Sequence, residues 1–264
     1  MAPRYGPPDA SKAPRYTGVR TFARLPHVTD PDGGDLDVTP GNALRTVEQL
    51  DAALRPVLEA GIVPVVLGGD HSIVLGELRA HAAVHGPVAL VLLDAHADTW
   101  DQYYGERYFH GTPFRRAVEE GLLDPGRSLL AGMRGSLYEP QDLDAAREMG
   151  FELVPGDELR TLTPEAYGER VRARVGDGPA FLSFDIDVLD PAFAPGTGTP
   201  ELAGLLPHEA LGFLRALAGM AFTGFDVVEC APPYDGPGQV TALHAAGVAY
   251  ELLALTAVAR RPAG

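Results

Sequence analysis

Cysteine, lysine and long apolar runs are almost missing from this 264-residue chain. The one cysteine, Cys230, excludes an intrachain disulfide framework and a thiolate-rich metal site, and it fits a reducing compartment. The one lysine is Lys12, and 36 acidic residues outnumber 21 basic ones, which excludes the basic surface of a nucleic-acid-binding protein. Apolar runs such as 88–93 are far shorter than the ~20 residues that span a bilayer. We therefore expect no membrane segment and, since the N-terminus lacks an apolar signal region, a cytoplasmic location.

The composition that remains describes an acidic globular protein. The formal net charge is -15 at pH 7, and 45% of the residues are hydrophobic. Such a charge suits a small cationic ligand or divalent metal ions, and ordinary solubility explains it equally well.

Glycine and proline divide the sequence into short apolar runs and amphipathic segments of helical length. We predict strands at 62–67, 88–93, 129–131, 151–154, 180–184 and 222–228. Helices are expected at 42–60, 73–83, 113–120, 141–149, 164–175, 207–217 and 240–257, with Asn42, Thr112 and Thr163 as N-caps. The alternation predicts an α/β fold with a mostly parallel sheet. Residues 1–40 are interpreted as an irregular arm and residues 41–264 as a single catalytic domain.

Three of the predicted strands end in polar clusters, at 68–72 (GGDHS), 94–98 (DAHAD) and 185–187 (DID). The carboxyl ends of strands form the ligand crevice of an open α/β sheet, so we expect these neighbouring strand ends to face one pocket. Asp94, His96 and Asp98 alternate with alanines, and an extended segment would turn all three side chains to one side. The clusters predict a site of four aspartates and two histidines, His71 and His96.

Four converging carboxylates would repel one another and take up protons unless cations were bound between them. Two divalent ions balance four aspartates. Oxygen ligands with two imidazoles and no thiolate favour a hard octahedral ion; Mn²⁺ fits best, and Co²⁺, Ni²⁺ or Zn²⁺ could replace it in vitro. Two such ions lower the pKa of a shared water and supply hydroxide at neutral pH.

These motifs resemble those of the binuclear manganese ureohydrolases, the family of arginase and agmatinase. The resemblance continues through 183–191 (SFDIDVLDP) and 192–201 (AFAPGTGTPE) and covers the chain from about residue 34 onward. Segments 110–117 (HGTPFRRA) and 229–235 (ECAPPYD) resemble the agmatinase and guanidino-acid hydrolase branch rather than arginase. The resemblance implies a three-layer αβα fold and a homotrimer or homohexamer.

The resemblance also implies roles for individual residues. One Mn²⁺ would be held by His71, Asp94, Asp98 and Asp185, and the other by Asp94, His96, Asp185 and Asp187. Asp98 is also expected among the catalytic groups, and Asp70 would support the ligands without binding metal. Glu229 would pair with the substrate guanidinium, which a carboxylate can hold through two hydrogen bonds. His110 would contact the substrate and shuttle protons, because imidazole titrates near neutral pH.

One part of the family pattern is missing. The family's first strand, and the Gly- and Arg-rich loop after it, should lie between Val28 and Gly34, where the chain has only 29–33 (TDPDG). Residues 5–28 resemble the arm that precedes this strand. Because the strand is interior in the family, its loss should leave unpaired backbone groups or change the strand order.

We therefore expect a metal-dependent amidinohydrolase that cleaves a linear guanidine to urea and an amine, with agmatine, which yields putrescine, as the first candidate substrate. A guanidino acid such as guanidinobutyrate or guanidinopropionate is the alternative, and it would need a cation such as Arg107, Arg134 or an arginine from another subunit. Two other hypotheses are a one-zinc deacetylase of similar fold and a non-catalytic metal-binding relative that was inactivated by loss of the strand.

Overall fold

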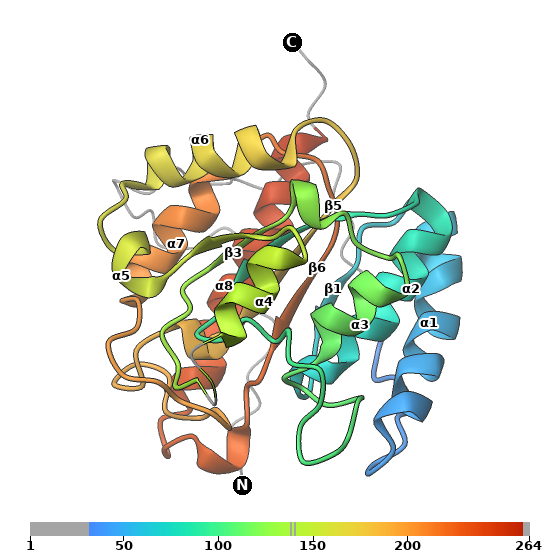
Figure 1. The fold of residues 1–264 in the computed structure, drawn as a ribbon, viewed down its shortest axis with the longest axis horizontal. Coiled ribbons are helices and arrows are strands. Elements are labelled where there is room, and N and C mark those ends of the chain that lie inside the picture. The colour runs from blue at the N-terminus through green and yellow to red at the C-terminus, as the bar shows by residue number, and fades with distance from the viewer. Residues whose placement is uncertain (1–31, 138, 140, 261–264) are drawn as a thin grey trace, which may run out of the picture. The chain divides into compact units, whose positions relative to one another are not determined.

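A computed structural model describes residues 32–137, 139 and 141–260 of the chain (Figure 1). From Asp32 onward the chain forms one compact unit around a six-stranded parallel sheet. Its strands are β1 (Val65–Leu67), β2 (Ala89–Leu93), β3 (Leu129–Ala131), β4 (Glu152–Val154), β5 (Ala180–Asp185) and β6 (Phe222–Val228). All six predicted strands are present. β1 begins three residues later than predicted, directly after Pro64, which has no N–H to donate to a neighbouring strand.

The predicted helices are also present, with ends shifted by at most two residues. They are α1 (Ala43–Glu59), α2 (Val74–His85), α3 (Pro113–Glu119), α4 (Asp142–Glu148), α6 (Pro164–Val175), α7 (Pro207–Ala216) and α8 (Val240–Ala259). The short α5 (Gly156–Leu159) and the 3-10 turns His71–Ile73, Pro125–Arg127, Ile186–Val188 and Pro232–Tyr234 were not predicted.

Two of the three predicted N-caps form. The side chains of Asn42 and Thr163 accept hydrogen bonds from the third residue after them. Thr112 occupies the N-cap position before Pro113, as predicted, but its side chain does not cap the helix: its hydroxyl lies 2.8 Å from the carbonyl oxygen of Arg107 and accepts the N–H of Phe109. Thr112 therefore ties down the loop before α3 rather than the helix itself.

The strand order is β1-β6-β5-β2-β3-β4. From β2 the chain continues to β3 on one side, whereas from β5 it continues to β6 on the other. The neighbouring strands β2 and β5 therefore form the topological switch point, where open α/β sheets bind ligands beyond the strand ends. Asp94 directly follows β2, and Asp185 ends β5.

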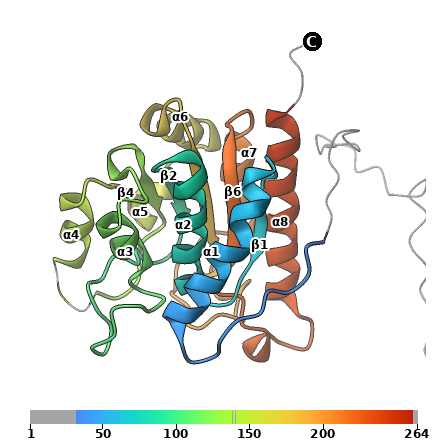
Figure 2. The same ribbon diagram turned by 90° about the vertical axis from the view of Figure 1, so that its right-hand side faces the viewer.

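Helices cover both faces of the sheet, as Figures 1 and 2 show. Alternate residues of β2 point to opposite faces: Val91 packs in a core with α6, α7 and α8, and Leu90 and Leu92 pack in a core with α2 and α3. A third cluster joins α1 to α2 and the end of β6. The three-layer αβα architecture follows from this burial of both faces.

β1 lies at one edge of the sheet and pairs only with β6 among the described residues. Leu67, at its end, is 68% exposed. Among the described residues, no further strand covers this edge. Residues 32–42 form no helix or strand. The rest of the predicted arm, with the segment 29–31, lies outside the described residues.

One expectation about apolar segments needs correction. α8 is a 20-residue helix that is long and apolar enough to cross a membrane, judged by length and composition alone. A core helix of a soluble protein passes the same test, and Val248, Leu252 and Leu255 of α8 do pack in the core.

Candidate metal centre

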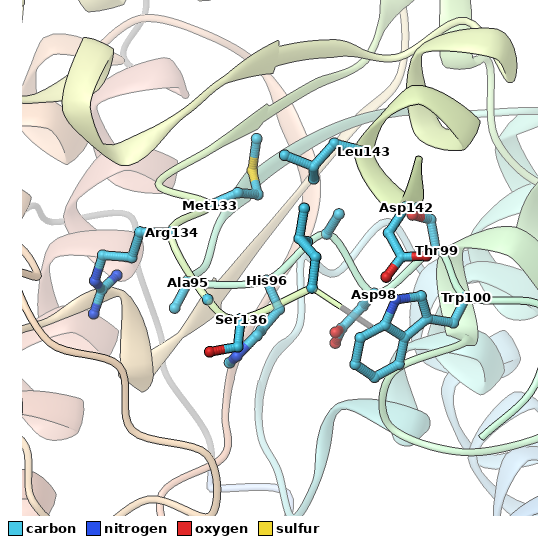
Figure 3. Close-up of a pocket in the computed structure, with 13 residues that line it drawn as sticks. Ala95, His96, Asp98, Thr99, Trp100, Met133, Arg134, Ser136, Asp142 and Leu143 are labelled. Carbon is cyan, nitrogen blue, oxygen red and sulfur yellow. The ribbon is translucent and has the colours of Figure 1, made fainter. Parts of the chain in front are cut away.

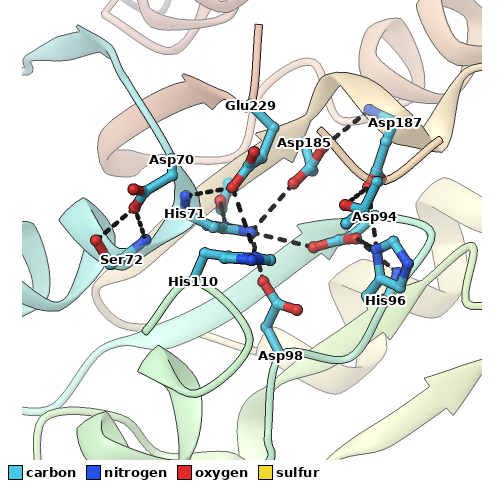
Figure 4. A network of polar contacts seen from close by, with 12 residues as sticks. Asp70, His71, Ser72, Asp94, His96, Asp98, His110, Asp185, Asp187 and Glu229 are labelled. Atoms are coloured by element: carbon cyan, nitrogen blue, oxygen red, sulfur yellow. Dashed lines mark hydrogen bonds and ion pairs between the residues drawn. The ribbon is translucent and has the colours of Figure 1, made fainter. Parts of the chain in front are cut away.

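The six predicted ligands come together at the carboxyl end of the sheet (Figure 4). Two groups have ligand atoms close enough to share an ion: His71 with Asp94 and Asp185, and Asp94 with His96 and Asp187. Asp94 belongs to both groups. Asp98 joins the first, because its Oδ2 lies 2.9 Å from Nδ1 of His71. The arrangement is that of two adjacent sites with a common carboxylate.

The prediction that these residues come from neighbouring strand ends is only partly right, because β2 and β5 are neighbours and β1 is not next to either. β6 lies between β1 and β5. The loop after β1 stays paired with the end of β6 through two hydrogen bonds, from Gly68 N to Val227 O and from Glu229 N to Gly69 O. The 3-10 turn that begins at His71 follows this loop. It places the imidazole of His71 next to Ser183 of β5 and Asp94 after β2.

The segment 94–98 also departs from the predicted extended conformation. The Asp94 carboxylate accepts the N–H of His96 at 2.6 Å, and the backbone of Asp98 is left-handed, with φ of 49°. The chain therefore bends, and the side chains separate: Asp98 faces His71, and Nδ1 of His96 lies 3.0 Å from Oδ2 of Asp187. All three still reach the cluster, so the prediction of convergence holds although its stated geometry was wrong.

Nδ1 of His71 faces three carboxylates. It lies 2.9 Å from Asp98, 3.2 Å from Asp94 and 3.3 Å from Asp185, measured to Oδ2 in each case. His71 and Asp94 are fully buried, yet Nδ1 and Asp94 Oδ2 have no hydrogen-bond partner of good geometry among the described residues. Buried nitrogen and oxygen atoms that converge without hydrogen-bond partners fit a metal ion, since one cation can accept an electron pair from each of them.

The electrostatics of the cluster support the same fit. Burial raises the pKa of Asp185 well above its usual value, and the charges of Asp187 and Asp94 raise it further. Burial and the charge of Asp94 also raise the pKa of Asp98. Burial lowers the pKa of His71, but the three facing carboxylates outweigh this effect and raise it well above its usual value. Divalent cations would offset this repulsion between the carboxylates.

Glu229 and His110 lie beside the cluster, as predicted (Figure 4). Oε1 of Glu229 accepts the backbone N–H of His71 at 2.7 Å, and Nδ1 of His110 lies 3.9 Å from the same oxygen. The Glu229 side chain is 10% exposed, and burial raises its pKa to about 8. A cationic group at this position would favour the ionised carboxylate.

Backbone strain occurs at two of the predicted site residues. Glu229 has φ of 63° and Asp98 has φ of 49°, in the left-handed region that most residues avoid. Such conformations cost of order 1–3 kcal/mol and persist where the surroundings enforce them, often at functional sites. Here they turn both carboxylates toward His71.

A cavity opens beside His96 and Asp98 (Figure 3). Its apolar walls include Trp100, Met133, Leu137 and Leu143, and Asp142 and Arg134 also line it. The guanidinium of Arg134 donates to four backbone carbonyls, those of Asp187, Leu189, Glu201 and Leu202, at 2.7–3.3 Å. Nε and Nη2 of Arg134 therefore hold the loop after β5 in place.

Asp70 has a local role. Its carboxylate accepts the N–H and the hydroxyl of Ser72 and so caps the 3-10 turn that carries His71. It therefore supports His71 through the backbone of the turn.

Sequence reasoning missed several residues that support the ligands. Ser183 lies 2.9 Å from Nε2 of His71 and donates to Asp226. A Cβ at Gly135 would lie 2.6 Å from Cδ2 of His96, so this glycine leaves room for the ring. Asp226 could have been found, because a lone carboxylate inside the apolar strand 222–228 signals a buried polar contact. Ser183 and Gly135 carry no comparable signal.

Comparison with known proteins places this site in context. A sequence model of the arginase family matches residues 4–255. The mitochondrial agmatinase of Gallus gallus is 44% identical over 256 residues, which is 95% of this chain and 74% of the relative. The guanidinopropionase of Pseudomonas aeruginosa is 39% identical over 306 positions, covering 95% and 96%. That alignment is longer than this 264-residue chain, so the relative has residues opposite gaps here.

The solved structures give the same result. Proclavaminate amidino hydrolase from Streptomyces clavuligerus has a TM-score of 0.81 and 42% identity to this chain, covering 86% of it and 75% of the solved chain.

Proposed function

This chain belongs to the arginase family and is a hydrolase of guanidino compounds, and from that premise we propose that its substrate is agmatine and that its metal is Mn²⁺. The products would be urea and putrescine. The choice of substrate and metal within the family is supported by the contacts around the candidate metal centre.

The ligand sets follow from the two groups of converging atoms. His71, Asp94, Asp98 and Asp185 would hold one ion, and Asp94, His96, Asp185 and Asp187 the other. When bound, two divalent cations lower the pKa of water and so supply a nucleophile at neutral pH. Oxygen ligands in the majority and the absence of thiolate favour Mn²⁺.

Glu229 would bind and orient the substrate. Its carboxylate is nearly buried beside the centre, so a guanidinium placed there gains a charge-assisted pair in a largely dry environment. This contact would orient the central carbon of the substrate toward the ligand cluster. His110 is partly exposed and lies between Glu229 and solvent-accessible space, which suits it to hold a proton and pass it to the leaving amine.

The tail of the substrate would enter the cavity beside His96 and Asp98. Among the described residues, Arg134 is the one arginine or lysine in its lining, and Nε and Nη2 of its guanidinium donate to backbone carbonyls. Arg107 pairs with Glu119 at 2.9 Å and is not part of the lining. A carboxylate tail therefore lacks an evident partner among the described residues. The carboxylates of Asp98 and Asp142 also line the cavity, and Oδ2 of Asp142 accepts the N–H of Glu139 at 3.2 Å. This excess of acidic groups in the lining is the observation that carries the choice of agmatine.

The test is urea release after Mn²⁺ loading, with agmatine, guanidinobutyrate, guanidinopropionate and arginine as substrates and chelated protein as control. We expect the highest kcat/KM with agmatine. Asp142→Asn should lower kcat/KM for agmatine and leave that for guanidinobutyrate unchanged. A preference for a guanidino acid would refute the substrate assignment, and no urea from any substrate would favour the non-catalytic relative.

Two further expectations belong to the same proposal. A homotrimer or homohexamer would be detected by light scattering coupled to gel filtration. A metal content near two ions per chain would exclude the one-zinc deacetylase hypothesis.

A further inference from the structure

A row of buried polar side chains continues from His71 into the protein, on the side away from the proposed metals. Nε2 of His71 lies 2.9 Å from Oγ of Ser183, and Oγ donates to Oδ1 of Asp226 at 2.7 Å. The same Asp226 oxygen accepts the N–H of Phe184 at 3.2 Å. His71, Ser183 and Asp226 are all fully buried.

The direction of these hydrogen bonds determines which nitrogen of His71 carries a proton. A serine hydroxyl has one proton, and here that proton goes to Asp226. Oγ of Ser183 can then only accept from Nε2–H of His71. Nδ1, which points at the carboxylates of the centre, is therefore the nitrogen that can give up its proton to a metal ion. The row thus fixes which nitrogen of His71 binds the metal.

Asp226 can hold this direction only while it remains an acceptor. Its second oxygen, Oδ2, is buried without a hydrogen-bond partner among the described residues. Both oxygens of Glu77, a fully buried residue of α2, are likewise without one. Unpaired buried carboxyl oxygens are costly, so these three atoms call for a common explanation.

The register of α2 on β6 brings Glu77 over Asp226. A Cβ at Gly224 would lie 2.4 Å from Cε1 of His81, so the ring of His81 rests on Gly224. One helical turn from His81 back to Glu77 covers about 6 Å, as do the two strand residues from Gly224 to Asp226. α2 runs opposite to the strands it connects, so the two steps go in the same direction.

Two facing carboxyls in a buried place cannot both be ionised. Burial raises the pKa of Glu77 well above its usual value, the charge of Asp226 raises it further, and the charge of His71 opposes both effects. Burial raises the pKa of Asp226 to about 6, while the Ser183 hydroxyl favours its charged form. His81, one turn away, has its pKa lowered to about 3 by burial and is neutral.

We propose that Glu77 is a neutral carboxylic acid that donates a hydrogen bond to Oδ2 of Asp226, and that this pair, through Ser183, keeps Nδ1 of His71 available to the metal. Glu77 is thus a positioning residue for the centre and touches neither metal nor substrate. The metal-binding half of this inference rests on the proposed function; the protonation of Glu77 does not.

The first test measures Mn²⁺ affinity with the metal alone, by calorimetric titration of metal-free protein. Glu77→Gln can still donate through its amide, so its Kd should stay within about threefold of wild type. Glu77→Met has similar length but no donor, and its Kd should rise about 10–100-fold, the usual effect of losing a partner of a metal ligand. Leu78→Met, at the next buried position of α2, is the matched control and should bind like wild type.

A double-mutant cycle with Ser183→Ala tests whether Glu77 acts through this row. Ser183→Ala should also raise the Kd about 10–100-fold. The Kd of the double variant Glu77→Met/Ser183→Ala should not exceed the higher Kd of the two single variants, because both substitutions interrupt the same chain of hydrogen bonds. Additive losses would overturn the route through Ser183. Equal losses in Glu77→Met and Leu78→Met, or no loss in Glu77→Met, would overturn the role of Glu77.

The second test uses metal-free protein, so it decides the protonation of Glu77 even if no Mn²⁺ binds. A carboxyl whose folded pKa is raised favours folding at low pH, and this contribution is lost as pH rises through the folded pKa. Glu77→Gln has nothing to ionise. Its Tm relative to wild type should therefore increase between pH 5 and pH 8, and a constant difference would show that Glu77 is not held neutral.

Discussion

Replacing Glu229 with glutamine removes the charge that should hold the substrate and changes little else. The new amide oxygen can still accept the N–H of His71, which now reaches Oε1 at 2.7 Å. The side chain is 10% exposed, so solvent weakens its pairing with a guanidinium only slightly. Breaking a buried ion pair by removing one partner costs about 3–5 kcal/mol. We expect a loss at the low end, because glutamine retains one acceptor.

A loss of about 3–4 kcal/mol lowers kcat/KM about 10²–10³-fold, since each factor of ten corresponds to about 1.4 kcal/mol. The assay is urea release from agmatine by the Mn²⁺-loaded variant, with Mn²⁺ affinity and Tm measured in parallel. Both of the latter should match wild type. Glu209→Gln is the matched control, because Glu209 also accepts a backbone N–H, that of Leu206 at 2.8 Å, but lies on α7.

Two results would refute this reasoning. If Glu229→Gln kept kcat/KM within about threefold of wild type, the carboxylate would not be the guanidinium partner. If Mn²⁺ affinity fell as far as activity, Glu229 would serve the metals rather than the substrate.

Three further predictions concern stability. Mn²⁺ at about 100 times its Kd should stabilise the fold by about 2.7 kcal/mol, seen as a rise in Tm that a chelator reverses; an unchanged Tm would contradict the metal centre. Gly224→Ala places a Cβ 2.4 Å from Cε1 of His81 and should cost about 1–3 kcal/mol in urea denaturation, so a neutral result would mean that α2 packs differently. Burial lowers the pKa of His81 to about 3, so its contribution to stability is complete above its unfolded pKa and is lost as pH falls below about 6, by at most about 1.4 kcal/mol per pH unit. His81→Leu should therefore flatten the acid side of the stability profile measured by Tm, and an unchanged slope would contradict a neutral buried ring.

Much of the fold could be predicted because its signals are local. Each strand is a short run of apolar residues with glycine, proline or a polar cluster at its end, and β3 and β6 have the predicted bounds. Both faces of a parallel sheet are buried, so such runs are hard to mistake. The start of β1 and the side-chain cap at Thr112 were wrong because Pro64 and the loop 107–112 make contacts that the pattern of apolar residues does not encode.

The candidate ligands were predictable for a related reason. Asp94, Asp185 and their neighbours follow directly after buried strands, where a polar cluster has few explanations other than a ligand site. Their family resemblance supplied the pairing into two sites, which the geometry of His71, Asp94 and Asp187 also supports.

The sequence by itself therefore determined the elements, the fold class and the set of candidate ligands, because each of these depends on residue type and spacing along the chain. Only the tertiary structure decided that β6 lies between β1 and β5, that Arg134 donates to backbone carbonyls, and that Ser183 contacts Nε2 of His71. It also buried the carboxyl groups of Glu77 and Asp226, which are far apart in the sequence. These features depend on the register of helices and strands against each other, and no local pattern carries that register.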